Sequence, residues 1–269
     1  MSSEKKHIVG IIGTGTMGEA LLASIIKSGV SGVEIAISDK SYEKTERLAK
    51  QYGCDVLTPN QLASTAETIF LVVKPQDLDE LLHFIGKSIS VGQRVISFAA
   101  GKKLSSIEGH LREGVAVLRV MPNTPMSVGI GASAISAGKY ARDSDVSALG
   151  DLLIASGKSI YIDEFLQDAV TATSGSGPAY FFRFVEAMIA GAQELGLSES
   201  DAKILVIQTI AGASEMLKQD GASPTKLREN VTSPNGTTFA ALQVFESNDL
   251  ETIIKKAMRA ARDRSQELS

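Results

Sequence analysis

The 269-residue chain has no tryptophan, a single cysteine and only 5% aromatic residues. With Cys54 alone, no internal disulfide can form, and a reducing compartment is favoured. Few aromatic rings and a net charge of -4 leave neither stacking platforms nor a basic surface, so we expect no nucleic-acid partner. Apolar runs such as "IFLVV" are too short to span a membrane, and glycines interrupt the N-terminal apolar segment too early for a secretion signal. These absences predict a soluble, cytoplasmic protein without membrane partners.

Histidine is also scarce. His7, His83 and His110 show no metal-ligand spacing, and the one cysteine is distant from them in sequence, so we predict no metal site. What the chain does contain, 43% hydrophobic and 22% charged residues, suits a globular protein of one large or two modest domains.

Up to Asp163, short strand-like runs alternate with amphipathic helical runs that end near a glycine. The expected strands are "HIVGII", "VEIAIS", "TIFLVV", "RVISFA", "VAVLRV", "GASAIS" and "KSIYI". Alternation of this kind predicts a parallel sheet with helices on both faces. We therefore expect an α/β fold, with a doubly wound sheet over residues 1–163.

Beyond Asp163 the strand signal disappears, and we expect an all-α domain over residues 164–269. The run "GPAYFFRFVEAMIAGAQELG" has apolar residues at helical spacing. The next helix is apolar on more than one face, with four consecutive apolar residues at Ile204–Ile207 and another at Ile210. About a hundred residues cannot enclose such helices alone, so we expect a second subunit to cover them.

The segment "GIIGTGTMGEALL" places Gly13, Gly15 and Gly18 in G-x-G-x-x-G spacing between an expected strand and an expected helix. This is the context in which the motif binds a dinucleotide. The first glycine permits a tight turn, the second lets backbone N–H groups approach a pyrophosphate, and the third allows close packing of helix on strand.

The second strand ends in "ISDKS", where signals for two cofactors conflict. Asp39 lies about 20 residues after the glycine motif, where an acid binds the ribose hydroxyls of NAD. Ser38, Lys40 and Ser41 could instead hold the 2′-phosphate of NADP. The loops "VVKPQD" and "SFAAG" close two further strands, and ligands of open α/β sheets bind outside such strand ends.

Two stretches in the second half resemble helix starts with more donors than a cap needs. They are "TATSGSGPAYFF", with Pro178 at the expected first helical position, and "TSPNGTTFAAL". Neither carries an acidic residue, and free N–H groups at a helix start bind carboxylate or phosphate readily. A generously capped helix is the alternative interpretation of each. Two such sites in one small domain favour a small anionic substrate.

With these motifs in view, the sequence resembles pyrroline-5-carboxylate reductases, the last enzymes of proline biosynthesis, over essentially its whole length. The resemblance rests on "GTGTMG", "VVKP", "SFAAG", "RVMPNTP", "TATSGSGPAYFF" and "ENVTSPNGTTFAAL" in the family's order. It implies an N-terminal Rossmann domain, an all-helical dimerisation domain, and an active site shared between the subunits of a homodimer. A larger ring, such as a decamer, is left open.

The resemblance also implies site residues. Those for the cofactor, NADP(H) with NAD(H) as an alternative, are Gly13, Thr14, Gly15, Thr16, Met17, Ser38, Asp39, Lys40, Asn60, Val73, Lys74, Pro75, Phe98, Ala99, Ala100 and Asn230. Those for an imino acid substrate are Glu164, Ser174, Gly175, Ser176, Gly177, Ser233, Gly236, Thr237 and Thr238, with Thr171 as the catalytic candidate. Asp39-Lys40 departs from the family's usual turn, which puts an NADPH preference in question.

Two other functions fit parts of the sequence. The N-terminal motif also resembles β-hydroxyacid dehydrogenases, but these use a lysine on the helix after the glycine-rich turn, and "GSGPAYFFRFVEA" offers only Arg183. A regulator that senses NADP(H) without chemistry is the other alternative. It would not need a second anion site.

Overall fold

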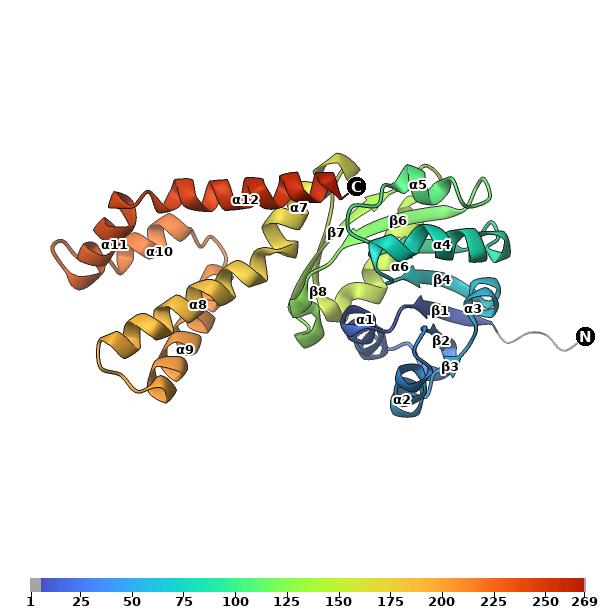
Figure 1. Cartoon of the computed structure of the whole chain (residues 1–269), viewed down its shortest axis with the longest axis horizontal. Coiled ribbons are helices and arrows are strands. Elements are labelled where there is room, and N and C mark those ends of the chain that lie inside the picture. Colours follow the sequence, from blue (N-terminus) through green and yellow to red (C-terminus); the bar gives the residue numbers. More distant parts are fainter. Residues whose placement is uncertain (1–5, 269) are drawn as a thin grey trace, which may run out of the picture. The chain divides into compact units, whose positions relative to one another are not determined.

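The computed structural model describes residues 6–268, which form two compact units (Figure 1). The first unit runs to Ser176 and includes the chain again from Ala261, whereas the second comprises Gly177–Ala260. The two units therefore divide between Ser176 and Gly177, beyond the boundary predicted after Asp163. Gln167 explains part of this difference, because its side chain is fully buried and its Nε2 donates to Ser136 Oγ at 2.8 Å, within the first unit.

Within the described residues, the first unit contains one eight-stranded sheet with strand order β3-β2-β1-β4-β5-β6-β7-β8. Its strands are β1 (His7–Ile12), β2 (Ile35–Ser38), β3 (Asp55–Val56), β4 (Ala66–Leu71), β5 (Arg94–Ser97), β6 (Ala116–Met121), β7 (Gly131–Ala137) and β8 (Gly157–Tyr161). Its helices are α1 (Thr16–Lys27), α2 (Tyr42–Tyr52), α3 (Pro59–Thr65), α4 (Pro75–Ile85), α5 (Leu104–Glu108), α6 (Asp143–Leu153) and α7 (Gln167–Val170).

Helices cover both faces of this sheet, which explains why its central strands are apolar along nearly their whole length. One core cluster joins the sheet to α1, α2 and α6 through Leu21, Ile25, Leu48 and Leu149. The other joins it to α3, α4 and α5 through Leu62, Leu78, Leu82 and Ile107. The sheet is thus doubly wound, as predicted.

The parallel strands end together, and their common edge positions the candidate site. In the sheet register Ile12 pairs with both Ser38 and Leu71, and Leu71 pairs with Ser97. The loops that follow β1, β2, β4 and β5 therefore leave the sheet side by side. These are the loops in which the sequence predicted cofactor contacts.

The last part of the sheet departs from the prediction of a parallel sheet. Strand β7 runs antiparallel to β6, although β7 and β8 are parallel to each other. The connection from β6 to β7 holds only the 3₁₀ turn Thr124–Val128, and a parallel pairing would need a crossover of a dozen or more residues. The short connection therefore fixes the antiparallel direction.

The second unit is helical. It contains α8 (Gly177–Glu194), α9 (Glu199–Leu217), α10 (Pro224–Asn230), α11 (Thr237–Ser247) and most of α12 (Leu250–Glu267). Among its described side chains, Ala202 and Val206 are the buried apolar ones, whereas large apolar residues such as Phe181 and Ile204 are more than 60% exposed. This unit lacks a closed core of its own. Nowhere in residues 6–268 is a helix both long and apolar enough to cross a membrane.

Candidate active site

The glycine-rich loop between β1 and α1 has the geometry that its spacing predicts. Gly13 has a φ of 99°, which favours glycine, and a Cβ there would lie 2.5 Å from the carbonyl oxygen of Val72. A Cβ on Gly18 would lie 2.0 Å from the carbonyl oxygen of Gly13. A Cβ on Gly15, by contrast, would meet no described atom within 4 Å apart from its neighbours in the chain. The first and third glycines are thus required by the fold, and the second leaves room for a ligand.

Helix α1 begins directly at this open position. Its N-cap residue is Gly15, and no side chain caps the helix within the described structure. The free N–H groups of the first turn and the helix dipole together form a site for an anion. The loop therefore fits the pyrophosphate of a dinucleotide.

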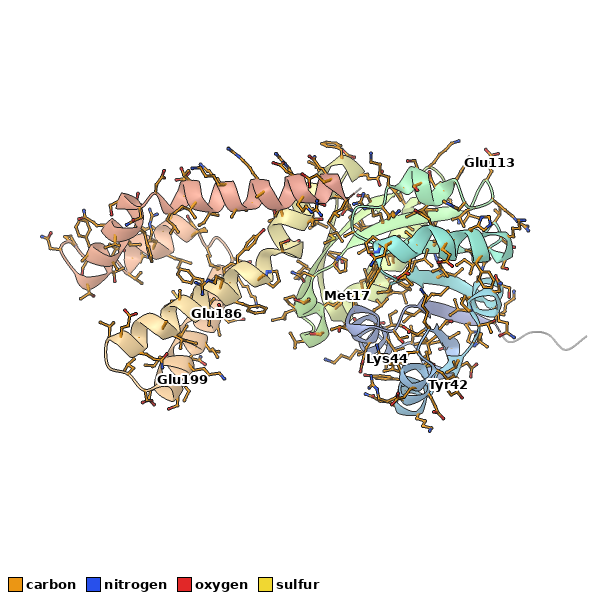
Figure 2. The ribbon with its side chains drawn as sticks, in the orientation of Figure 1. Met17, Tyr42, Lys44, Glu113, Glu186 and Glu199 are labelled. Atoms are coloured by element: carbon orange, nitrogen blue, oxygen red, sulfur yellow. The ribbon has the colours of Figure 1, made fainter. Side chains whose placement is uncertain are left out.

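A groove of about 650 Å³ opens beside this loop. Seven predicted cofactor residues line it: Gly13, Gly15, Ser38, Asp39, Lys40, Val73 and Lys74. Thr14 is not part of the groove lining; it is buried and its N–H donates to Asp39. Thr16 is exposed on the first turn of α1, and Met17 packs partly against the core. Figure 2 labels Met17 on α1 and Lys44 near the start of α2. Lys44 also lines the groove.

Several groove residues were not predicted from the sequence. Helix α4 contributes Asp77, Glu80, Leu81 and Phe84. These residues have the spacing i, i+3, i+4, i+7 of one helical face, and Phe84 remains 59% exposed. The feature of the sequence that could have indicated these residues is Phe84, an aromatic residue on a helix face that also carries acidic residues. The pattern of α4 by itself indicates only a helix that covers the sheet, and it does not show that the outer face borders a groove.

Asp39 is held firmly at the end of β2. Its Oδ2 accepts hydrogen bonds from the backbone N–H (2.6 Å) and the hydroxyl (3.1 Å) of Thr14, and its Oδ1 accepts one from the N–H of Ser41 (2.9 Å). Burial by itself raises the pKa of Asp39, but the hydrogen bonds from Ser41 and Thr14 outweigh it and lower the pKa below its usual value. The carboxylate is therefore ionised at neutral pH. Its contribution to stability is present above pH ~4 and lost as the pH falls through the lowered value.

The neighbouring lysine is partly neutralised. Lys40 Nζ lies 3.0 Å from Asp77 Oδ1, and this hydrogen bond raises the pKa of Lys40. A 2′-phosphate at this end of the groove would therefore meet one fixed carboxylate and a lysine that already has a partner. Lys44, a further cation of the groove lining, shares this end with them.

Replacing Asp39 by asparagine should shift the nucleotide preference toward NADPH. The change removes a negative charge beside the expected 2′-phosphate, and we expect the NADPH:NADH ratio of kcat/KM to rise about tenfold, equal to about 1.4 kcal/mol. Steady-state kinetics with each nucleotide measures the ratio. Glu43→Gln on exposed α2 is the matched control, because it changes the net charge equally without lining the groove. An unchanged NADPH:NADH ratio in Asp39→Asn would contradict the expectation that the 2′-phosphate lies beside Asp39.

The other predicted cofactor residues lie outside the groove lining. Pro75 opens α4 and directly follows Lys74. Phe98 and Ala99 are buried just beyond β5, where Phe98 packs edge-to-face on Phe70 at 5.8 Å, and Ala100 is half-buried. Asn60 Oδ1 accepts a hydrogen bond from Ser88 Oγ (3.1 Å). Asn230 is exposed at the end of α10, in the second unit.

The stretch "TATSGSG" is not the free helix start that the sequence predicted. Residues Thr171–Gly175 form a π-helical turn that continues α7, and α8 begins at Gly177, so Pro178 is its second residue. The N–H of Ser176 donates to the carbonyl of Thr171 (2.7 Å). The prediction failed because the preceding residues, "QDAV", are already helical.

The hydroxyls of this π turn bond back to the helix before it. Thr171 Oγ1 donates to the carbonyl of Gln167 (2.9 Å), and Ser174 Oγ donates to that of Val170 (3.3 Å). Their protons are therefore in use, while their oxygen lone pairs remain acceptors. Π turns inside helices are frequent at functional sites.

Glu164 is engaged with the fold of the first unit. Its Oε1 accepts a hydrogen bond from the N–H of Leu104 (2.6 Å), at the start of α5, and one from Arg119 Nη1 (3.1 Å). The Arg119 side chain is only 5% exposed, and that of Glu164 is 30% exposed. This carboxylate therefore neutralises a buried guanidinium, whatever else it contacts.

The start of α11 does have the bare N-terminus that the sequence predicted. Gly236 is its N-cap residue, without a side-chain cap in the described structure. The turn before it is tight, because Asn235 has a φ of 57° and a Cβ on Gly236 would lie 2.3 Å from Ser233 Oγ. Thr237 and Thr238 form the first turn, so hydroxyls and free N–H groups gather at one point.

Metal-dependent or thiol chemistry finds no support among the described residues. No group of three or more His, Cys, Asp or Glu side chains is placed to hold a metal ion there. Burial raises the pKa of the Cys54 thiol to about 11, so the thiol stays protonated at neutral pH.

Comparison with known proteins now identifies the family. The model of the pyrroline-5-carboxylate reductase dimerisation family matches residues 164–268, and that of the coenzyme F420-dependent NADP oxidoreductase family matches residues 8–101. The chain is 37% identical to the pyrroline-5-carboxylate reductase of Pseudomonas aeruginosa, over 97% of this chain and 96% of that protein. For the enzyme of Corynebacterium melassecola the values are 38%, 97% and 98%. The chain belongs to the pyrroline-5-carboxylate reductase family.

Solved structures agree with this family. A pyrroline-5-carboxylate reductase from Coxiella burnetii matches with a TM-score of 0.93 and 32% identity, over 98% of this chain and 99% of that chain. The Plasmodium falciparum pyrroline carboxylate reductase, solved with NADP bound, matches with a TM-score of 0.87 and 29% identity, over 98% of each chain. The predicted family and fold class are confirmed. The site residues and the domain boundary remain predictions.

Proposed function

We propose that the chain reduces 1-pyrroline-5-carboxylate to L-proline with a hydride from NAD(P)H, as the last step of proline biosynthesis. The observation that carries the proposal is the match to curated pyrroline-5-carboxylate reductases along nearly the whole chain, at 37% identity for the P. aeruginosa enzyme. In this proposal, the groove beside the glycine-rich loop and the bare start of α11 would provide the two anion sites that the reaction needs.

The groove residues fit a nicotinamide dinucleotide. The open position at Gly15 and the uncapped α1 would hold the pyrophosphate, and Asp39 with Lys40 would contact the adenosine ribose. Leu81 and Phe84 offer an apolar surface for the adenine. A reduced nucleotide bound there supplies the hydride for the imine carbon.

For the substrate, the start of α11 would bind the carboxylate. Ser233 and Thr238 would donate from their hydroxyls, and the first N–H groups of the helix would add the field of its dipole. Fixing the carboxylate orients the ring, and orientation is worth several kcal/mol in reactions of this kind.

Thr171 would then orient the substrate ring by accepting a hydrogen bond from the ring N–H. An imine accepts hydride well only when its nitrogen is protonated, and solution supplies that proton. The resulting N–H needs an acceptor, and Thr171 Oγ1 can be one because its own proton is directed at the carbonyl of Gln167. The hydride forms the new C–H bond, the C=N electron pair moves to nitrogen, and the product is a secondary amine.

This assignment predicts different effects for the two threonines. Thr238→Ala should mainly raise the KM for the imino acid, because the carboxylate is held throughout the reaction. Thr171→Val should mainly lower kcat, by about ten- to a hundredfold, because one oriented hydrogen bond is lost. Steady-state kinetics with varied imino acid separates the two effects. Complete inactivity of a folded, ligand-binding Thr171→Val would show that Thr171 is an obligatory proton donor.

The subunits would form a homodimer with a shared active site in the cytoplasm, with a larger ring such as a decamer as a further level of assembly. Support comes from the dimerisation family match and the exposed apolar helices. Ile207→Glu should yield monomers, because Ile207 is 47% exposed on α9 and its change would place a charge in the interface.

Light scattering and the kcat of Ile207→Glu test this prediction together. Val206→Glu is the contrasting variant, since Val206 is only 6% exposed within its own subunit and its change should unfold α8 and α9 as well. A folded, fully active Ile207→Glu monomer would contradict the shared site.

The decisive assay follows NADPH and NADH oxidation in parallel with pyrroline-5-carboxylate. Oxidation that depends on the imino acid, with proline as product, supports the proposed function. Tight nucleotide binding without turnover would instead favour the NADP(H)-sensing regulator. Turnover of 3-hydroxy acids with NADP⁺ would favour the β-hydroxyacid dehydrogenase.

A further inference from the structure

The π turn at Thr171–Gly175 is held from outside by Asn123. The Nδ2 of this asparagine donates to the carbonyl oxygen of Ser174 at 3.1 Å. In a π turn the backbone bonds run from i to i+5, as they do from Ser176 N to Thr171 O, so its carbonyls are displaced from the α-helical positions. A donor aimed at Ser174 O stabilises this displaced peptide.

The amide of Asn123 has little freedom to turn away. Its Oδ1 accepts a hydrogen bond from the N–H of Ala132, on β7, at 2.8 Å. Donor and acceptor ends of the amide are therefore both bound, which fixes its orientation between the sheet and the π turn. Asn123 lies in an extended conformation (φ −134°, ψ 164°) just beyond the end of β6.

A second contact reaches the same turn from the same strand end. A Cβ on Gly175 would lie 2.6 Å from Met121 Cε, so Met121 packs tightly against the turn at that glycine. Met121 and Asn123 are two residues apart in extended chain and so share one face. The end of β6 thus holds the π turn by one apolar and one polar contact.

We propose that Asn123 is a positioning residue for the reduction, acting through the π turn on the hydroxyl of Thr171. The inference rests on the proposed function. Without the bond to Ser174 O, the turn can relax toward α-helical spacing, and this rotates Thr171 relative to the carboxyl edge of the sheet. A misplacement of about 1 Å at a reacting group is enough to cost about a hundredfold in rate.

Asn123→Asp tests the role, because it removes the donor to Ser174 while keeping an acceptor for Ala132. We expect kcat to fall by about thirtyfold or more and the nucleotide Kd to stay within about twofold. Amide hydrogen exchange in residues 171–177 should accelerate, and exchange in β1 and α1 should not. Asn123→Ala, which introduces no charge, should show the same pattern and decides the question if Asn123→Asp is insoluble.

Thr68→Val is the matched control. Thr68 is buried on β4, where its hydroxyl accepts a hydrogen bond from Arg94 Nε (3.0 Å), and it does not line the groove. Thr68→Val should lower the melting temperature but should not lower kcat as the Asn123 variants do. The proposal is overturned if both Asn123 variants keep kcat within about threefold of the parent enzyme, or if exchange at 171–177 is unchanged. Failure of the parent enzyme to turn over would refute the proposed function instead, and the exchange measurement would still test the role of Asn123.

Discussion

Gly15→Val is expected to lose nucleotide binding by about a hundredfold or more while keeping the melting temperature of the parent protein. The space around Gly15 is open, and its φ of −65° and ψ of −171° suit any residue, so the fold should accept the side chain. The added methyl groups would occupy the space into which a pyrophosphate must come to reach the first N–H groups of α1. Fluorescence titration with NADPH and a thermal melt measure the two quantities.

Gly18→Ala is the companion variant, with a different expected pattern. Its Cβ would meet the carbonyl oxygen of Gly13 at 2.0 Å, so the helix and the loop must separate. We expect it to lose nucleotide binding and also about 1–3 kcal/mol or more of folding stability. If Gly15→Val instead binds NADPH normally, the pyrophosphate does not lie at α1 and the cofactor site is misassigned.

Glu164→Ala is expected to cost about 3–5 kcal/mol in the free energy of unfolding, because it leaves the Arg119 guanidinium buried without its partner. Glu164→Gln keeps an oxygen that can accept from Leu104 and Arg119, and should cost much less. The double variant Glu164→Ala/Arg119→Met should recover part of the loss. Urea unfolding followed by circular dichroism suits this chain, because it contains no tryptophan.

The same variants test the predicted substrate role of Glu164. A Glu164→Gln protein that is stable but has a raised KM for the imino acid would support a contact with substrate. A Glu164→Ala protein that loses less than about 1 kcal/mol would show that the Arg119 pair does not stabilise the fold.

The sequence predicted those features that depend on local rules. The G-x-G-x-x-G spacing located the loop because the turn after Gly13 and the packing at Gly18 each require a glycine. The alternation of strands and helices predicted the doubly wound sheet, because apolar strands must be covered by helices on both faces. The bare start of α11 followed from its lack of an acidic residue.

Other features were not predicted. The antiparallel direction of β7 follows from the short connection between β6 and β7, which the prediction of a parallel sheet did not take into account. The π turn accepts a hydrogen bond from Asn123, which is remote in sequence, and the "TATSGSG" stretch by itself suggested a helix start. The apolar pattern of α9 also did not predict which of its residues are buried within the subunit. Val206 and Ile207 are adjacent and both apolar, yet of these two only Val206 is buried.

The division of the chain into units has a consequence for its biosynthesis. The second unit, Gly177–Ala260, is inserted within the first, and the closing segment of the first begins only at Ala261. Within that segment, Ser265 is buried and its Oγ donates to Asp168 Oδ1 at 2.7 Å. A ribosome therefore completes the first unit only after the whole helical unit has been made. Until that segment has been made, Asp168 in "QDAV" lacks its partner Ser265.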